Sequence, residues 1–283
     1  MKLSSVLEFV YGMLYAAMIS FPSVVRAVFK SPSLLLNPTE MSRIGMAAIW
    51  VLFGAGGDEG KRALRQELIT PNAQGIVLDI GAGASPLSPQ RSRDPTLIFL
   101  KHFTGHGHAA NYLDHEKVSK YVALEPNTHM HARLREIAEA AGFREDAGTL
   151  LILACGAEDA DSILSAVGGP VDTMIAMYTL CSIPDPQRAI HALVERVLAP
   201  GGKFLMHEHV LSRHADVAWW QRVLTPLWRI FFDGCELHRP TDVWIRELVD
   251  GDSGKSWWQD SNMWEGEARA MLPNMNGIFT RSA

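Results

Sequence analysis

A chain of 283 residues, 47% of them apolar, is long enough to bury the core of one sizeable α/β domain with extensions. Its formal net charge of −5 provides no basic face of the kind that nucleic-acid-binding proteins need, so we expect no nucleic-acid partner. The three cysteines, Cys155, Cys181 and Cys235, are too few and too widely spaced to indicate a disulfide framework or a zinc site. We therefore expect reduced thiols and no metal, and the sequence does not indicate an oligomeric state.

The first thirty residues form an apolar segment that differs from the rest of the chain. No charged residue occurs between Phe9 and Val25, a run at the lower limit of length for a bilayer-spanning helix, and Pro22 lies inside it. A secretory signal and a buried core helix would show a similar pattern. We favour a membrane-associating helix over residues 1–30, because Glu8 interrupts the start of the segment and no clear cleavage site follows.

A second apolar stretch, residues 44–55, is shorter than the first. We interpret residues 31–60 as a helical linker or cap, which covers the catalytic domain or the rim of its pocket. The glycine-rich residues 54–60 then lead to an amphipathic segment, residues 61–68, before the first strand. The main domain is expected over residues 61–283.

The most informative stretch is residues 77–83, where an apolar run and an acid lead into a Gly-x-Gly turn. Glycine allows positive φ and leaves room for a ligand against the backbone. In doubly wound α/β folds, this first turn receives the nucleotide part of a cofactor. Asp79, just before Gly81 and Gly83, would repel a pyrophosphate but suits a cationic cofactor that carries an amino acid, such as S-adenosylmethionine (SAM). An ordinary tight turn is the alternative.

Four further strands are expected, in alternation with helical stretches. The second ends at Glu125, whose carboxylate can accept hydrogen bonds from two ribose hydroxyls. A helix is expected before the Pro200-Gly201-Gly202 turn. This alternation predicts a doubly wound, mostly parallel α/β sheet of the Rossmann-like kind. The segments are residues 121–127, 150–159, 171–180 and 203–210 for the strands, and residues 189–198 for the helix.

This order of elements resembles that of class I SAM-dependent methyltransferases, over roughly residues 60–280. The resemblance rests on residues 78–83, the strand end at Glu125, residues 156–159 and the turn at residues 198–202. More narrowly, the chain resembles the membrane-associated methyltransferase-like group whose animal members methylate alkyl thiols. That narrower resemblance is carried by residues 179–183, by residues 196–210, and by the later Trp-Gln…Pro-x-Trp…Asp-Gly-Cys-x-Leu-x-Arg pattern of residues 220–239.

The narrower resemblance implies SAM as the cofactor and a small lipophilic acceptor, most simply a thiol. It also implies a site on the endoplasmic reticulum or lipid-droplet membrane, with the catalytic domain facing the cytosol. From their positions at successive strand ends we expect Glu125 at the ribose, Ala157 and Glu158 at the adenine, and Tyr178 and Thr179 near the methionine end. The full set of expected cofactor-binding residues is Asp79, Gly81, Gly83, Glu125, Pro126, Asn127, Ala157, Glu158, Tyr178 and Thr179.

Two residues are candidates for a catalytic role. His207 and His209 alternate with Glu208 at the end of the fifth strand, so the two imidazoles share one face. We rank His209 first, because the resemblance includes it, and a purely structural role at the strand end is the alternative. Asp233, in a turn that could close over the acceptor, is the second candidate.

Two other functions stay open at this point. One is a small-molecule O-methyltransferase of secondary metabolism, and the other is a non-catalytic, membrane-bound protein of the same fold. A hydroxyl acceptor requires a general base, whereas a thiol with a pKa of about 8.5 requires less help. Loss of His209 should therefore affect O-methylation more than S-methylation. The aromatic-rich residues 219–232 would form either core packing or an apolar wall for the acceptor.

One segment breaks the pattern. The stretch from Asp79 to Glu125 is more than twice the roughly 20 residues usual between these two elements. The excess lies in residues 84–104, whose prolines and clustered charges make a poor buried strand. We interpret it as an insertion loop or a foreign translated piece such as a retained intron, and we expect its deletion to preserve or improve SAM binding. A metal site on the histidines nearby is disfavoured; these are His106, His108 and His115.

Overall fold

The computed structural model describes residues 3–83, 109–266 and 270–283, and for residues 3–5 and 50–61 it describes the backbone alone. The expected insertion, residues 84–104, lies outside the described residues, as do His106 and His108.

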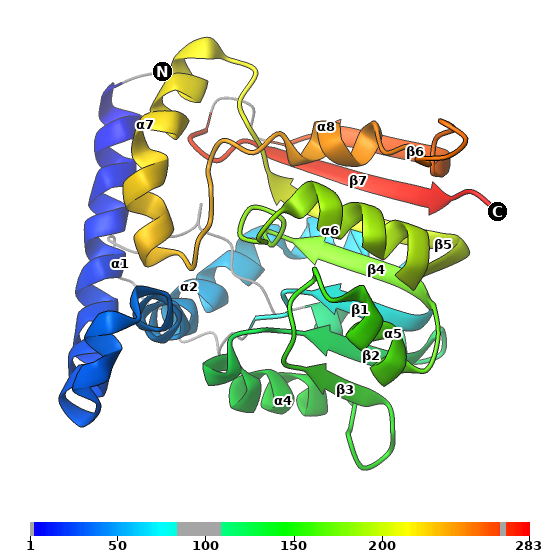
Figure 1. The fold of residues 1–283 in the computed structure, drawn as a ribbon, viewed down its shortest axis with the longest axis horizontal. Coiled ribbons are helices and arrows are strands. Elements are labelled where there is room, and N and C mark those ends of the chain that lie inside the picture. The colour runs from blue at the N-terminus through cyan, green and yellow to red at the C-terminus, as the bar shows by residue number, and fades with distance from the viewer. Residues whose placement is uncertain (1–2, 84–108, 267–269) are drawn as a thin grey trace.

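One seven-stranded sheet with the order β3-β2-β1-β4-β5-β7-β6 forms the centre of the protein (Figure 1). The first five strands pair in parallel, and β7 joins β5 and β6 in antiparallel register. This confirms the expected doubly wound, mostly parallel α/β fold. The strands are β1 (Gly75–Ile80), β2 (Val118–Leu124), β3 (Leu150–Leu153), β4 (Val171–Met177), β5 (Leu198–His209), β6 (Trp258–Glu265) and β7 (Asn274–Arg281).

Helices cover both faces of the sheet (Figure 1). Capping side chains and glycines define the ends of several of them. In α5, for example, the Asp159 side chain accepts a hydrogen bond from the Ser162 N–H at 3.1 Å, and Gly168 ends the helix at φ 91°. The helices after β1 are η2 (Ala109–Tyr112), η3 (Thr128–Met130), α4 (His131–Ala140), α5 (Ala160–Val167), α6 (Pro186–Ala192) with its π-helical continuation η4 (Leu193–Val197), α7 (Ala215–Phe231) and α8 (Thr241–Arg246).

The order of the strands determines where a ligand-binding crevice forms. The chain moves outward from β1 to β2 and β3, and then crosses back to β4 and β5 on the other side of β1. The loops that follow β1 and β4 therefore leave the sheet in opposite directions. In open α/β sheets, ligands bind in the crevice that forms at this point, beyond the carboxyl ends of the strands.

The N-terminal helix α1 (Leu3–Lys30) packs along α2 (Pro38–Leu68) and α7, and the turn η1 (Pro32–Leu36) joins α1 to α2 (Figure 1). Its buried side chains include Phe9, Met13 and Ala16, and the Phe9 ring stacks on Trp228 of α7 with centroids 4.8 Å apart. Since these residues belong to the core, the packing argues that α1 contributes to folding rather than being dispensable.

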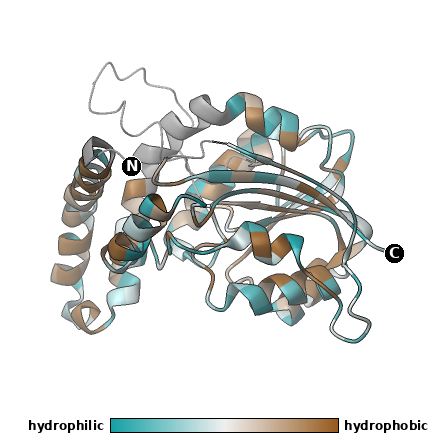
Figure 2. Ribbon diagram, turned by 90° about the horizontal axis from the view of Figure 1, so that it is seen from above, coloured by the Kyte–Doolittle hydropathy of each residue, from teal (hydrophilic) through white to brown (hydrophobic). Residues whose placement is uncertain are grey.

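The opposite face of α1 is also apolar but exposed. Leu7, Leu14, Met18 and Phe21 each keep more than 60% of their surface accessible. In Figure 2, the helices beside the N-terminus carry mostly hydrophobic residues. Within the described part of the chain, α1 is the one helix long and apolar enough to cross a membrane, judged by length and composition.

Helix α2 is longer than the sequence indicated. It runs through residues 54–60, where we expected a glycine-rich link, and continues without a break to Leu68. Its start is well defined: Pro38 occupies the first turn and the Asn37 side chain accepts a hydrogen bond from the Glu40 N–H at 3.1 Å.

Phe9→Ala should destabilise the protein by about 3 kcal/mol, because it removes a buried ring and leaves a cavity beside Trp228. Leu14→Ala, on the exposed face of the same helix, is the matched control and should change the free energy of unfolding by less than about 0.5 kcal/mol. Urea unfolding of the two variants in the same mild detergent measures both values. Equal losses would mean that α1 does not pack on α7 as described.

Candidate functional site

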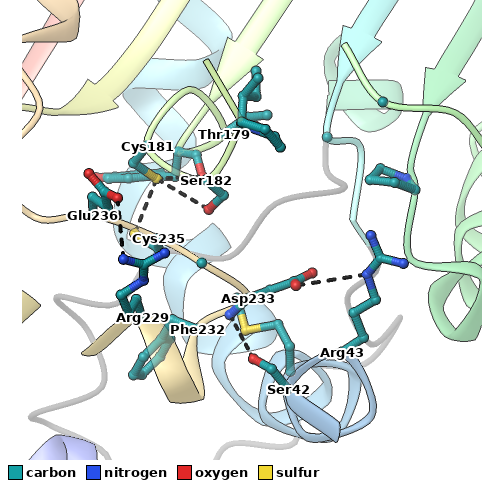
Figure 3. Close-up of a pocket in the computed structure, with 18 of the residues that line it drawn as sticks. Ser42, Arg43, Thr179, Cys181, Ser182, Arg229, Phe232, Asp233, Cys235 and Glu236 are labelled. Carbon is teal, nitrogen blue, oxygen red and sulfur yellow. Dashed lines mark hydrogen bonds and ion pairs between the residues drawn. The ribbon is translucent and has the colours of Figure 1, made fainter. Parts of the chain in front are cut away.

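A cavity of about 580 Å³ opens at the carboxyl ends of β1, β2, β4 and β5 (Figure 3). Its floor comes from the loops that follow these strands, and its roof comes from α2 and from α7 with the turn after it. This volume is in the range of sites that enclose small molecules.

The turn after β1 provides a close-fitting glycine edge. Gly81 and Gly83 have φ values of 66° and 56°, which favour glycine. A Cβ on Gly81 would lie 2.5 Å from Cγ2 of Thr179, so no other residue fits there without displacing the Thr179 side chain. The two glycines therefore allow the loops after β1 and β4 to meet at the pocket.

Glu125 lies at the end of β2 with both carboxylate oxygens oriented by backbone groups. The N–H of Gly83 donates to Oε2 at 2.9 Å, and the N–H of Asn127 donates to Oε1 at 2.7 Å. Burial raises the pKa of Glu125 to about 7, against the lowering effect of these two hydrogen bonds. Each oxygen keeps a further lone pair, so the carboxylate is able to accept hydroxyl hydrogens from a ribose.

Two of the expected cofactor residues, Asp79 and Asn127, do not line the cavity. The Asp79 carboxylate accepts a hydrogen bond from the Tyr121 hydroxyl at 2.7 Å, and burial raises its pKa to about 7. The Asn127 side chain donates to the Arg43 carbonyl at 3.0 Å and so ties the loop after β2 to α2. Each residue therefore joins elements that border the pocket and does not face the pocket itself. The other eight expected cofactor residues line it: Gly81, Gly83, Glu125, Pro126, Ala157, Glu158, Tyr178 and Thr179.

The loop after β4 is held by a buried carboxylate from the next strand. Oε1 of Glu208 accepts hydrogen bonds from the N–H groups of Thr179 at 2.8 Å and Leu180 at 3.2 Å. The Thr179 hydroxyl donates to the Ile80 carbonyl at 2.7 Å, which joins this loop to β1. Tyr178 takes a left-handed backbone conformation with φ 54°, and its hydroxyl donates to Asn274 at 2.6 Å.

His209 lines the pocket, whereas His207 on the same face of β5 lies outside the lining and contacts Asn276. Beside His209 the fold brings together two cysteines that are far apart in the sequence. The Cys235 and Cys181 sulfurs are 3.2 Å apart, and His209 Nε2 is 3.2 Å from the Cys235 sulfur. The wide spacing of the cysteines in the sequence gave no sign of this proximity, which arises because the loop after β4 and the turn after α7 meet at the end of β5. Burial raises the pKa of Cys181 well above its usual value.

Asp233 also lines the pocket, next to residues of α2. The Asp233 N–H donates to the Ser42 hydroxyl at 3.2 Å, and its carboxylate is 3.9 Å from Arg43 Nε (Figure 3). Burial raises the pKa of Asp233, and the Arg43 guanidinium opposes that shift. Ser42 and Arg43 also line the pocket but were not among the expected site residues, although both lie within residues 31–60, which we interpreted as a linker or cap.

The buried carboxyl of Glu208 predicts a pH-dependent stability. Burial raises its pKa from 4.5 to about 7, so between these values the unfolded chain has lost a proton that the folded protein keeps. The free energy of unfolding should therefore fall as pH rises through this window, and Asp79 and Glu125 add changes of the same sign.

Glu208→Gln keeps the acceptor for Thr179 and Leu180 but removes the ionisation, so it should reduce this fall in stability. Urea unfolding between about pH 4.5 and about pH 7.5 tests the change. Glu139→Gln, on the exposed face of α4, is the control and should retain the full wild-type slope. An unchanged slope in the Glu208 variant would contradict the prediction.

Comparison with known proteins agrees with this geometry. A family profile described as a methyltransferase domain matches residues 58–244. Thiol S-methyltransferase TMT1A of Homo sapiens is 30% identical over 137 residues, which are 48% of this chain and 53% of that protein. Thiol S-methyltransferase TMT1B of Rattus norvegicus is 30% identical over 152 residues, 53% of this chain and 57% of that protein. The matches thus span little more than half the length of these relatives.

Among solved structures, an O-methyltransferase family protein from Burkholderia thailandensis superposes with a TM-score of 0.54 at 14% identity, covering 96% of this chain and 71% of the other. The CurJ carbon methyltransferase superposes with a TM-score of 0.52 at 13% identity, covering 100% and 72%. At this identity the likeness concerns the fold alone. With the family match extending over most of the sheet and the pocket, the chain belongs to the methyltransferase-domain family of SAM-dependent enzymes.

Proposed function

We propose that this protein transfers the methyl group of SAM to a small lipophilic thiol. The observation that carries the proposal is a single cavity with two chemically different ends. One end has the glycine turn and the oriented Glu125 carboxylate. The other has the buried Cys181, His209 and Cys235 side chains beside the aromatic residues of α7.

The residues at the first end fit SAM. Glu125 is oriented by two backbone N–H groups and is able to accept ribose hydroxyls, while Gly81 and Gly83 leave room along the backbone. Ala157 and Glu158 line the side where the adenine is expected. SAM, when bound, supplies an electrophilic methyl group on a sulfonium.

The residues at the other end fit an apolar acceptor. Trp228 and Phe232 stack with centroids 3.7 Å apart and line the cavity together with Met46 and Leu272. Such a wall excludes water and holds an alkyl chain, and the enzyme's main task is then to hold the acceptor sulfur in line with the methyl carbon. A thiol needs only modest help to ionise, and the two curated relatives are named thiol S-methyltransferases.

Small-molecule O-methylation is the second candidate, because His209 lines the pocket at a position suited to a general base. An alkyl thiol and the alcohol of the same carbon skeleton distinguish the two. We expect the thiol to be methylated at least about 100-fold faster than the alcohol. The rate is measured with excess SAM, as methylated product detected by mass spectrometry. Preferential methylation of the alcohol would support the O-methyl function, and no product from any acceptor together with no SAM binding would support a non-catalytic role.

Glu125→Ala should weaken SAM binding by about 1.5–3 kcal/mol, because it removes a charge-assisted acceptor. Isothermal titration calorimetry of the full chain measures the dissociation constant. Glu139→Ala, an exposed substitution on α4, is the control and should leave SAM binding unchanged. Equal affinities in the Glu125 variant and the wild type would mean that the ribose lies elsewhere.

We further propose that the protein lies on a membrane surface, of the endoplasmic reticulum or lipid droplets, with the catalytic domain in the cytosol. The exposed apolar side chains of α1 continue across its neighbour α7, where Trp219, Val223 and Ile230 are about half exposed, and Leu35 and Leu36 follow in η1. Because one face of α1 packs on the domain, this arrangement favours a helix that lies in the interface over one that spans the bilayer.

Replacing Leu14 and Phe21 together by Glu should release the protein from lipid, since both side chains are exposed on α1 and outside its packed face. Co-sedimentation with phosphatidylcholine vesicles measures the bound fraction, which we expect to fall several-fold. Gln187→Glu adds charge at an exposed position on α6 and should bind as the wild type does. If the double variant sediments with vesicles to the same extent, the apolar face does not bind lipid.

A further inference from the structure

Three side chains at the acceptor end of the cavity form a ligand set for a metal ion. The Cys181, His209 and Cys235 ligand atoms all lie within 4.8 Å of one another, and all three residues are buried. Two thiolates and one imidazole are donors that Zn²⁺ prefers. Of the three, only His209 entered our sequence-based site, and there as a base.

The spacing of the three donors suits one tetrahedral ion. With Zn–S near 2.3 Å and Zn–N near 2.0 Å, ligand atoms of one ion lie roughly 3.5–4 Å apart. The sulfurs of Cys181 and Cys235 are 3.2 Å apart, and His209 Nε2 is 3.2 Å from the Cys235 sulfur. Small side-chain rotations are enough to open these distances around an ion.

Backbone hydrogen bonds fix the positions from which the three donors project. The N–H of Glu236 donates to the Cys181 carbonyl at 3.0 Å, which ties the turn after α7 to the loop after β4. That turn is also closed by the Cys235 N–H, which donates to the Phe232 carbonyl at 2.9 Å. His209 is the last residue of β5. Three separate elements are thus locked together where the donors meet, as a preorganised site requires.

The charge environment also fits an ion. A zinc ion with two thiolates is neutral, so the assembled site adds no net charge to a buried region. Arg239 lines the same cavity, and its guanidinium donates to the carbonyls of Leu180 and Ile183 at 3.0 Å and 2.7 Å, so these contacts hold its charge in place. Nε2 of His209, which faces the Cys235 sulfur, is the ring nitrogen placed to bind the ion.

We propose that Cys181, His209 and Cys235 bind a Zn²⁺ ion whose fourth coordination position faces the cavity and takes the acceptor thiol. Three protein ligands with one open position is the arrangement of catalytic zinc, as opposed to the four ligands of structural zinc. All three ligand residues line the same cavity as Tyr178 and Thr179, where the methionine end of SAM is expected. The proposal rests on the proposed thiol methylation for the identity of the fourth ligand.

The step balances without a further reactant. The acceptor thiol loses its proton to solvent as its sulfur binds the ion, and the thiolate sulfur then forms a bond to the methyl carbon of SAM. The bond from that carbon to the sulfonium breaks, and its electron pair stays on the sulfur of S-adenosylhomocysteine. The methyl thioether product is neutral and a weaker ligand than a thiolate, so it leaves the ion. In this arrangement His209 is a ligand rather than a base.

Cobalt substitution tests the site without reference to activity. The full-length protein, freed of metal by chelation under reducing conditions, is titrated with Co²⁺ and its absorption spectrum recorded. We expect tetrahedral visible bands and thiolate charge-transfer bands that saturate at about one ion per chain. Cys181→Ser and Cys235→Ser should each weaken the charge-transfer bands and the affinity at least 10-fold. Cys155→Ser removes the third cysteine, which is outside the cluster, and should behave as the wild type.

Cysteine modification in the wild-type protein tests the site even if the variants fail to fold. With zinc bound, a thiol reagent should modify about two fewer cysteines per chain than after chelation. The metal site is overturned if the cobalt spectra lack thiolate bands or if the thiols react equally with and without zinc. It is also overturned if exposure to metal and air yields only a disulfide between Cys181 and Cys235.

The fourth position has its own readout. Adding an alkyl thiol to the cobalt protein should intensify the charge-transfer bands, whereas the matching alcohol should leave them unchanged. No response to the thiol overturns the assignment of the fourth ligand. If the cobalt bands respond to the thiol but the protein never methylates that thiol with SAM, the metal site holds and the proposed function is refuted. Failure of the metal site and failure of the proposed function are therefore distinguishable.

Discussion

The pocket depends on one buried carboxylate, that of Glu208. Its Oε1 holds the N–H groups of Thr179 and Leu180, and it is completely removed from solvent. A buried acid is costly unless hydrogen bonds compensate it, so its presence between two strands requires the loop after β4 to take this one conformation. That loop in turn sets the positive φ of Tyr178, contacts Gly81 through Thr179, and presents Cys181 to the cavity. Both ends of the pocket are therefore positioned from the same strand end.

The helices outside the sheet connect the pocket to the exposed apolar face. Pro226 and Ile230 of α7 line the cavity, Ile230 is also 59% exposed, and α7 packs against α1. The same helix thus borders the acceptor end on one side and the proposed lipid-facing surface on the other. If the proposed membrane location and lipophilic acceptor hold, this geometry gives the acceptor a short route from lipid to pocket with little exposure of its apolar surface to water.

Sequence patterns predicted the parts that depend on local chemistry. The glycine turn after β1 and the acid after β2 are visible because positive φ and hydrogen-bond acceptors are needed at strand ends, and Gly81, Gly83 and Glu125 do line the cavity. The antiparallel β6–β7 pair was missed, since its residues alternate weakly. The meeting of Cys181 with Cys235 was missed because it depends on how α7 packs over β5, and no spacing along the chain encodes that. Asp79 faces Tyr121 for a similar reason, because the register of β1 against β2 decides which side chains meet.

The apolar character of one end of the cavity affects the energetics of methyl transfer. Transfer of a methyl group from a sulfonium cation to a thiolate converts two opposite charges into two neutral sulfides, so charge disappears as the transition state forms. A water-poor, apolar site stabilises such a transition state relative to the separated ions, which lose hydration on entry. The wall of Trp228 and Phe232 and the burial of Cys181 and His209 provide that environment. A hydroxyl acceptor is much less acidic than a thiol and needs a general base to take its proton during the transfer. The physical character of the pocket therefore supports the thiol acceptor that we propose.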